Sequence, residues 1–201
     1  MALYCVNELK LKSGRALVIV AHPDDETIWM GGAILKNPQI TWTIFALCRA
    51  ADKDRAPKFR EVCKYYGAHP IITDLEDEDI MDIRESIQKI RRLIKQKIGR
   101  QKFDYIFTHG SNGEYGHPRH TGVSRAVKSM IKNGEMRSGQ LLNFAYTTDG
   151  KNSILEDKSA KFFIRLSRRE LAGKRNIIKK LYGFSQYSFE NLSCLPLETF
   201  K

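Results

Sequence analysis

The chain has 201 residues, of which 42% are hydrophobic and 28% are charged, and its formal net charge is +11. This length and composition predict one globular domain over residues 1–201, large enough to bury a sizeable core. The longest apolar runs are about five residues, against the roughly 20 that a transmembrane helix needs, which argues against an integral membrane segment. The first 15 residues are mixed polar and basic rather than signal-like, so we expect a cytoplasmic protein.

Short apolar runs typical of buried strands alternate with helical patterns along the chain. The predicted strands are residues 16–21, 41–48, 70–73, 105–108 and 141–146. The predicted helices are residues 27–36, 57–66, 81–97, 121–132 and 168–182. This alternation predicts an α/β fold, a Rossmann-like three-layer α/β/α arrangement with a mostly parallel sheet.

The positive charge is concentrated in the second half of the chain. Residues 1–100 carry a net charge of +3 and residues 101–201 a net charge of +8. Such an excess attracts anions, but the basic residues form no dense block with interleaved aromatics, and no nucleic-acid motif is present. We therefore expect no nucleic-acid partner, and a nucleic-acid-binding protein is a competing hypothesis motivated by charge alone. The four cysteines have no CxxC spacing, which predicts buried thiols in a reducing compartment.

The most informative motif follows the first predicted strand, where residues 21–26 read Ala-His-Pro-Asp-Asp-Glu. Pro23 ends the strand, so His22, Asp24, Asp25 and Glu26 gather just past its carboxyl end. That edge is where open α/β sheets bind ligands. Because buried charges need partners or a metal, this cluster predicts a functional site.

The same turn argues against a nucleotide cofactor. A dinucleotide site needs glycines directly after the first strand, so that the backbone can approach a pyrophosphate. Gly31 and Gly32 come too late for that purpose and are better explained by close helix packing.

A second polar cluster, residues 108–120, follows the fourth predicted strand and contains His109, His117 and His120. In a doubly wound sheet this loop and the first one meet at one edge. His22 and Asp25 from the first loop with His120 from the second would supply three nitrogen and oxygen ligands, as in catalytic zinc sites. His109 either lines this site or simply ends its strand.

These two motifs, Ala-His-Pro-Asp-Asp-Glu and a later His-Pro-x-His, closely resemble those of the PIG-L/LmbE-like de-N-acetylases. The resemblance runs from residue 16 to about residue 186, and it includes Arg49 after the second strand and the Ser-Gln pair at residues 185–186. Members of that family remove acetyl groups from N-acetylglucosamine conjugates. The resemblance thus implies a zinc-dependent hydrolase acting on a small-molecule amino-sugar conjugate.

Position by position, the resemblance implies that His22, Asp25 and His120 hold one Zn²⁺, in a site that other divalent metals also fit. It makes Asp24 the general base and His117 the electrophile or general acid. The residue chemistry supports this division, because two adjacent carboxylates in a turn cannot both face one metal. One can bind the ion while its neighbour accepts a proton from the activated water.

Two further residues of these motifs have more than one interpretation. Arg49 binds substrate or stabilises charge, or it is a structural or surface arginine. Glu26 accepts hydrogen bonds from backbone N–H groups at the helix start or supports a ligand, and we expect no catalytic role for it.

Arg119 is a departure from the family pattern, because many members have an aspartate between the two histidines. An aspartate can hold the ring N–H of His117, whereas an arginine has no acceptor. Either another carboxylate orients His117, with Glu114 the nearest in sequence, or the loop works differently, or activity is weakened. The last case leaves an alternative function, a sugar-conjugate binding or regulatory protein.

The substrate expectation follows from charge. We expect Arg119 to lie at the pocket mouth and to bind substrate. Together with the net charge of +8 in the second half of the chain, this favours an anionic substituent on the conjugate. The sequence does not fix the oligomeric state, and a homo-oligomer is compatible with it.

Overall fold

A computed structural model describes residues 7–77, 81–151 and 153–201. Its centre is a five-stranded sheet in the order β4-β3-β2-β5-β6, in which all neighbouring strands are parallel. The strands are β2 (Gly14–Val20), β3 (Ile40–Cys48), β4 (His69–Leu75), β5 (Lys102–Thr108) and β6 (Arg137–Asn143). The predicted α/β fold with a parallel sheet is confirmed, and each strand of this sheet overlaps a predicted one.

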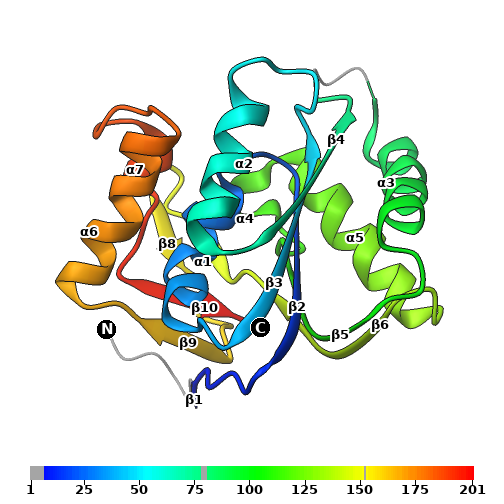
Figure 1. Ribbon diagram of the computed structural model, residues 1–201, viewed down its shortest axis with the longest axis horizontal. Helices are drawn as coiled ribbons and strands as arrows, with labels where there is room; N and C mark the ends of the chain where they lie inside the picture. The colour runs from blue at the N-terminus through cyan, green and yellow to red at the C-terminus, as the bar shows by residue number, and fades with distance from the viewer. Residues whose placement is uncertain (1–6, 78–80, 152) are drawn as a thin grey trace.

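Helices cover both faces of this sheet (Figure 1). They are α1 (Asp25–Lys36), α2 (Arg55–Tyr66), α3 (Ile83–Ile98) and α5 (Pro118–Lys132). One core contains side chains of α1 and α2, and the other contains side chains of α3 and α5. The helices thus lie on opposite sides of the strands, as the three-layer prediction requires.

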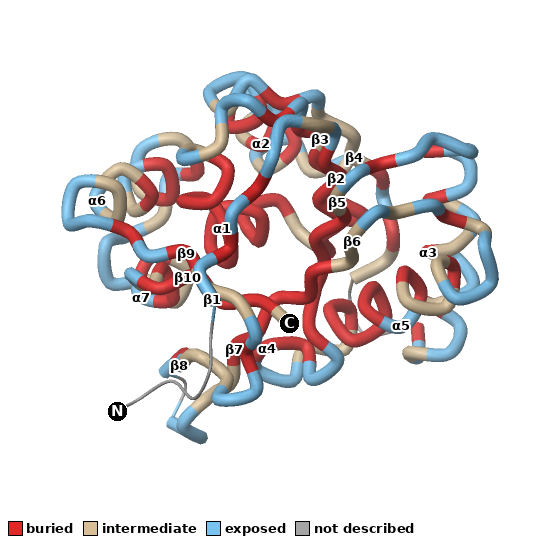
Figure 2. Tube along the Cα trace, turned by 90° about the horizontal axis from the view of Figure 1, so that it is seen from below, coloured by how far each residue is buried: buried red, intermediate tan, exposed pale blue. Residues whose placement is uncertain are grey.

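Strand β2 shows why the sequence forms a central parallel strand. Val18 and Val20 point into the core with α1 and α2, while Leu17 and Ile19 point into the core with α3 and α5. A strand buried on both faces needs a continuous apolar run rather than an alternating one. Figure 2, seen from below, shows β2 and β5 buried in the middle of the molecule, with exposed segments on the outer sides of α2, α3 and α6.

The C-terminal region forms structure that the sequence pattern did not predict. A second, three-stranded sheet joins β1 (Asn7–Glu8), β9 (Phe162–Arg165) and β10 (Leu197–Phe200). A short hairpin, β7 (Tyr146–Thr148) with β8 (Ile154–Glu156), precedes it. These strands are two to four residues long, too short for a periodicity to be recognised.

The predicted helix at residues 168–182 is divided. Helix α6 (Arg168–Asn176) continues as a π-helical turn, η1 (Ile177–Leu181), and a short α7 (Phe189–Leu192) follows. Ser167 and Glu170 form a capping box that starts α6. A short α4 (Gly113–Gly116) lies in the loop before α5.

Two smaller predictions have clear outcomes. The described cysteines, Cys48, Cys63 and Cys194, are free and buried, whereas Cys5 lies outside the described residues. Close packing around α1 explains the glycine pair, because a Cβ at Gly31 would lie 2.8 Å from Tyr66 Oη on α2, and one at Gly32 would lie 2.3 Å from Leu166 Cδ2, just before α6. Within the described ranges, the structure contains no helix of the length and apolarity required to span a membrane.

Candidate metal centre and active site

The two polar loops meet where the strand order of the sheet reverses. β2 pairs with β3 on one side and with β5 on the other, and the loops that follow β2 and β5 carry the two predicted clusters. At such a switch point, neighbouring loops diverge to opposite faces of the sheet and leave a crevice. The two polar clusters therefore lie together, as the sequence predicts.

The backbone is strained at this place. Asp24, Arg49 and Glu114 have φ angles of 108°, 72° and 58°, and no other described residue except glycine has a positive φ. Such conformations cost of order 1–3 kcal/mol each and persist where the surrounding structure enforces them, often at functional sites. The sequence predicts all three of these residues to belong to the site.

Three ligand atoms form a compact triangle. His22 Nδ1 lies 3.2 Å from Asp25 Oδ2 and 3.4 Å from His120 Nε2, and the last two atoms are 3.4 Å apart. A tetrahedral ion with bonds of 2.0–2.1 Å separates its ligands by about 3.3 Å. The donor set and spacing of His22, Asp25 and His120 therefore fit a zinc-like ion.

The outer nitrogens of both candidate histidine ligands face carboxylates. His22 Nε2 lies 2.9 Å from Asp77 Oδ1, and His120 Nδ1 lies 2.7 Å from Glu114 Oε2. Such carboxylate–histidine contacts fix the tautomer and ring orientation of metal-binding imidazoles. They leave His22 Nδ1 and His120 Nε2 for the ion.

Glu114 also holds His109. His109 Nδ1 lies 2.9 Å from Glu114 Oε2, and its Nε2 accepts the backbone N–H of Ala21 at 3.0 Å. Since Nε2 accepts, Nδ1 carries the proton and donates it to Glu114. The ring of His109 stacks on that of His120 at 3.8 Å between centroids. His109 is thus buried behind the site, where it contacts Glu114 and His120. It does not line the cavity, but it does more than end its strand.

The electrostatics of the cluster favour a cation. Burial alone would lower the pKa of His22, but hydrogen bonds to Asp25 and Asp77 outweigh it and raise the pKa to about 9. Burial would raise the pKa of Glu114, but His109 and His120 lower it to about 2. The carboxylates therefore remain charged and draw positive charge to the histidines, which a metal ion would supply.

Asp24 lies beside the triangle with its own partners. Burial, followed by repulsion from Asp25, raises its pKa well above the usual range, and Arg55 acts in the opposite direction. Arg55 Nη1 donates to Asp24 Oδ2 at 2.8 Å and its guanidinium lies 4.3 Å from the ring centre of Phe184. Nothing in the local sequence around Arg55, at the start of α2, indicates that it lies at the site.

Glu26 is entirely buried and has the predicted supporting role. It accepts the backbone N–H of Asp24 at 3.1 Å and the hydroxyls of Thr27 and Tyr182 at 2.6 and 2.8 Å. Burial raises its pKa to about 7. It holds the strained turn at Asp24 and connects it to the C-terminal region.

His117 is oriented by the backbone of its own helix. Its Nδ1 accepts the N–H of Arg119 at 3.2 Å, which makes His117 the N-cap of α5. Burial, with His120 and His22 nearby, lowers its pKa to about 4. The ring is therefore neutral at neutral pH, with its proton on Nε2.

The structure corrects two expectations about this loop. Glu114 supports His120 and His109 instead of His117. Arg119 is buried rather than at a pocket mouth: it donates to the carbonyl oxygens of Glu76 and Met81 at 2.7 and 3.2 Å and to the Glu76 carboxylate at 2.8 Å. Because its guanidinium is buried against the segment after β4 and does not line the cavity described below, Arg119 is not placed to bind substrate.

A cavity of about 320 Å³ opens in front of the triangle. Its walls include candidate site residues from both loops and aromatic side chains from α4 and α7. The lining residues that matter here are His22, Asp24, Asp25, Arg49, Asp52, Arg55, Tyr115, His117 and Phe189. Arg49 thus lies at the cavity, where it donates to Asp77 at 3.0 Å.

Two contacts missed from sequence carry recognisable signals. Asp77 follows the carboxyl end of β4, so the rule that selected the other loops also applies to it. Trp29 lies one helical turn after Asp25 and donates its indole N–H to Asp25 Oδ1 at 2.9 Å. Residues at i and i+4 share a helix face, so this contact was accessible from spacing.

Comparison with known proteins identifies the family to which the chain belongs. The PIG-L family model, described as GlcNAc-PI de-N-acetylase, matches residues 17–131. The N-acetylglucosaminyl-phosphatidylinositol de-N-acetylase of Bos taurus is 24% identical over 135 residues, which cover 62% of this chain and 53% of that protein. The chain thus spans about half the length of this relative.

Solved structures share the fold at low sequence identity. The N,N'-diacetylchitobiose deacetylase of Pyrococcus horikoshii has a TM-score of 0.54 and 15% identity, covering 93% of this chain and 82% of that one. The 4-carboxy-2-hydroxymuconate hydratase of Pseudomonas putida KT2440 has a TM-score of 0.62 and 15% identity, covering 89% and 82%. One fold thus serves two reaction types, and the family match is the more specific finding. On that match, the chain belongs to the PIG-L family.

Proposed function

We propose that this protein is a metal-dependent hydrolase that removes the acetyl group from an N-acetylated amino sugar. The observation that carries the proposal is the triangle of His22, Asp25 and His120 with Asp24 and His117 at the same cavity. Membership in a family described by de-N-acetylation gives the reaction class. A zinc ion held by the triangle would lower the pKa of a bound water to about 7 and polarise the acetyl carbonyl.

Asp24 is the proposed general base. Its raised pKa moves the carboxylate toward the range in which a base works best at neutral pH. Because Arg55 holds Oδ2, the other carboxylate oxygen is the one we expect to accept the proton of the attacking water. Asp24 then returns this proton to the departing amine.

His117 is the proposed donor to the oxyanion. Its Nδ1 is occupied by the Arg119 N–H, so the neutral ring offers an Nε2–H. A fixed N–H donor at the place where negative charge develops stabilises the transition state. The alternative, a weakened binding or regulatory homologue, is motivated by Arg119 in place of the family's aspartate. The N-cap contact supports the hydrolase instead, because it orients His117 through a backbone N–H that does not require an aspartate at position 119.

Arg49 and Arg55 are the cations at the cavity that would contact the sugar conjugate. Both already face carboxylates, Asp77 and Asp24 respectively. The side chain of Arg49 is 43% exposed, which leaves donors for a hydroxyl or an anionic substituent. Because Arg119 does not line the cavity, Arg49 and Arg55 are the side chains that support an anionic substituent on the substrate.

The test is to load purified protein with zinc and measure acetate released from a panel of neutral and anionic N-acetylglucosamine conjugates. We expect one zinc per chain and turnover of at least one conjugate. His120→Ala should lose both zinc and turnover. A fully zinc-loaded protein that releases no acetate from any conjugate would contradict the proposed reaction, and full zinc content in His120→Ala would contradict the ligand set.

A further inference from the structure

Asp25 has two oxygens with different surroundings. Oδ2 belongs to the ligand triangle and also accepts the backbone N–H of His22 at 2.8 Å. Oδ1 accepts the indole N–H of Trp29 at 2.9 Å. Trp29 is fully buried and Asp25 is 3% exposed, so water does not compete effectively for either oxygen.

We propose that Trp29 is a positioning residue that keeps Asp25 a one-oxygen ligand. The inference rests on the metal site of the proposed function. A carboxylate can bind a metal through one oxygen or both. By occupying Oδ1, the indole would leave one more position of the ion open, which catalytic zinc sites need for water and substrate.

The helix around Trp29 is built in an unusual way that fixes the indole. Met30 has non-helical dihedral angles (φ −151°, ψ 18°), which break α1 immediately after Trp29. The N–H of Ala33, which would normally donate to the Trp29 carbonyl, donates instead to Glu198 Oε2 at 2.6 Å. The freed carbonyl of Trp29 accepts the hydroxyl of Tyr146 at 2.7 Å.

The groups that replace the broken helical bonds are themselves buried and paired. Glu198 also accepts the N–H of Gly32 at 2.8 Å, and Lys174 donates to it at 2.7 Å. Glu198, Lys174 and Tyr146 are all fully buried. The ring of Tyr146 packs on Trp29 with 5.1 Å between centroids. The amides of Gly32 and Ala33 and the carbonyl of Trp29, which the break in α1 leaves without helical partners, thus all have buried partners. These contacts fix the indole beside Asp25.

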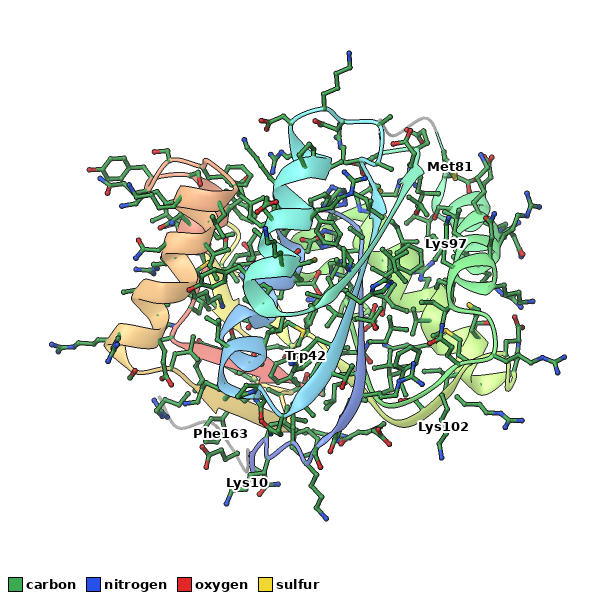
Figure 3. All side chains as sticks on the ribbon, in the orientation of Figure 1. Lys10, Trp42, Met81, Lys97, Lys102 and Phe163 are labelled. Carbon is green, nitrogen blue, oxygen red and sulfur yellow. The ribbon has the colours of Figure 1, made fainter. Side chains whose placement is uncertain are left out.

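Trp29→Phe and Trp42→Phe form a matched pair for the test. Both tryptophans are buried, at 0% and 2% exposure, and each donates one indole hydrogen bond. Trp42 donates to the backbone oxygen of Asn37 and lies in the lower half of the molecule, away from the carboxyl ends of the strands (Figure 3). Both variants lose a buried N–H, but only Trp29→Phe frees an oxygen of Asp25.

The readouts are Co²⁺ affinity and the visible absorption of the Co²⁺-loaded protein, which is more intense for four-coordinate than for five-coordinate cobalt. We expect Trp29→Phe to bind Co²⁺ about 10- to 100-fold more weakly, the usual effect of removing a support of a metal ligand. Its absorption should also weaken as Asp25 Oδ1 joins the ion. Trp42→Phe should match wild type in both readouts.

A second variant guards against a folding failure. Tyr146→Phe keeps the indole but releases the Trp29 carbonyl, so it should shift Co²⁺ affinity and absorption in the same direction by a smaller amount. Wild-type affinity and spectrum in Trp29→Phe, or in Tyr146→Phe if Trp29→Phe does not fold, would overturn the inference. An equal loss in Trp42→Phe would overturn it too. Absence of Co²⁺ binding by wild type would overturn the metal site itself, and the inference with it.

Discussion

The two loops that build the site differ in how directly their sequence determines their geometry. In the loop after β2, the structure places His22 and Asp25 at the triangle, Asp24 beside it and Glu26 behind it. In the loop after β5, it places His120 at the triangle and His117 at the same cavity. Glu114 and Arg119 contact groups other than those expected.

Loop length explains the contrast. The first loop is one turn between a strand end and a helix start, so the two elements fix the direction of each side chain. The second contains α4 and has positive φ at Gly113, Glu114 and Gly116. Its side-chain directions depend on backbone reversals that no apolar pattern encodes. Adjacent residues in a short turn are therefore safer functional predictions than residues in a long one.

The largest effect should come from the short loop, where neighbouring aspartates have separate roles. Asp24→Asn should keep its metal but lose turnover by about 100-fold or more, because the general base is removed. Asp25→Asn should lose the metal and the activity together. Metal content and kcat of both variants, measured on the same preparations, provide the check; equal metal loss in the two would refute the division.

An intermediate effect should come from Glu114 in the long loop. Glu114→Gln should weaken metal affinity about 10- to 100-fold, because one amide oxygen replaces a carboxylate that accepts from both His120 and His109. Glu85→Gln, at an exposed carboxylate on α3, is the control and should bind metal as wild type does. If Glu114→Gln instead lowered turnover with unchanged metal affinity, Glu114 would be acting on His117 after all.

The smallest effect on catalysis should come from Arg119. Arg119→Asp restores the residue that many family members have, yet it should not raise kcat/KM, because His117 already has a partner. It should lower the free energy of unfolding by about 3–5 kcal/mol, since the buried ion pair with Glu76 and the hydrogen bonds to the Glu76 and Met81 carbonyl oxygens are lost. Denaturant unfolding and kcat/KM measure the two quantities, and a clear gain in kcat/KM would show that His117 lacks its orienting group.

The titration of His117 sharpens this test. Burial and the neighbouring His120 and His22 lower its pKa to about 4, so the ring stays neutral as pH falls from 6.5 to that value. Over this interval the unfolded chain binds more protons, and His117 therefore makes the folded state less stable as pH decreases. Arg119→Met should leave the ring titration unchanged by NMR. A shift toward 6.5 would mean that the Arg119 charge sets this pKa.

The sequence predicted those parts of the fold that depend on periodicity. The strands of the parallel sheet and the stripe of α3, with Ile90, Ile94 and Ile98 buried, follow from repeats that physical packing requires. The proposed metal-ligand set follows from residue type and strand ends. Arg55 and the break at Met30 do not follow, because each depends on contacts between residues distant in sequence. The three positive φ angles likewise result from tertiary structure that overrides local preference.

The contacts that hold α1 come partly from residues outside the segment that matches the family. The region matched by the family model ends at residue 131, whereas Glu198, which accepts the amides of Gly32 and Ala33, and Lys174, which donates to Glu198, lie well beyond it. A fragment limited to the matched region would contain every proposed metal ligand but would leave these amides without their acceptor. The segment by which the family is recognised thus lacks contacts that hold α1, and boundaries drawn from sequence similarity alone would separate the proposed metal ligands from these contacts.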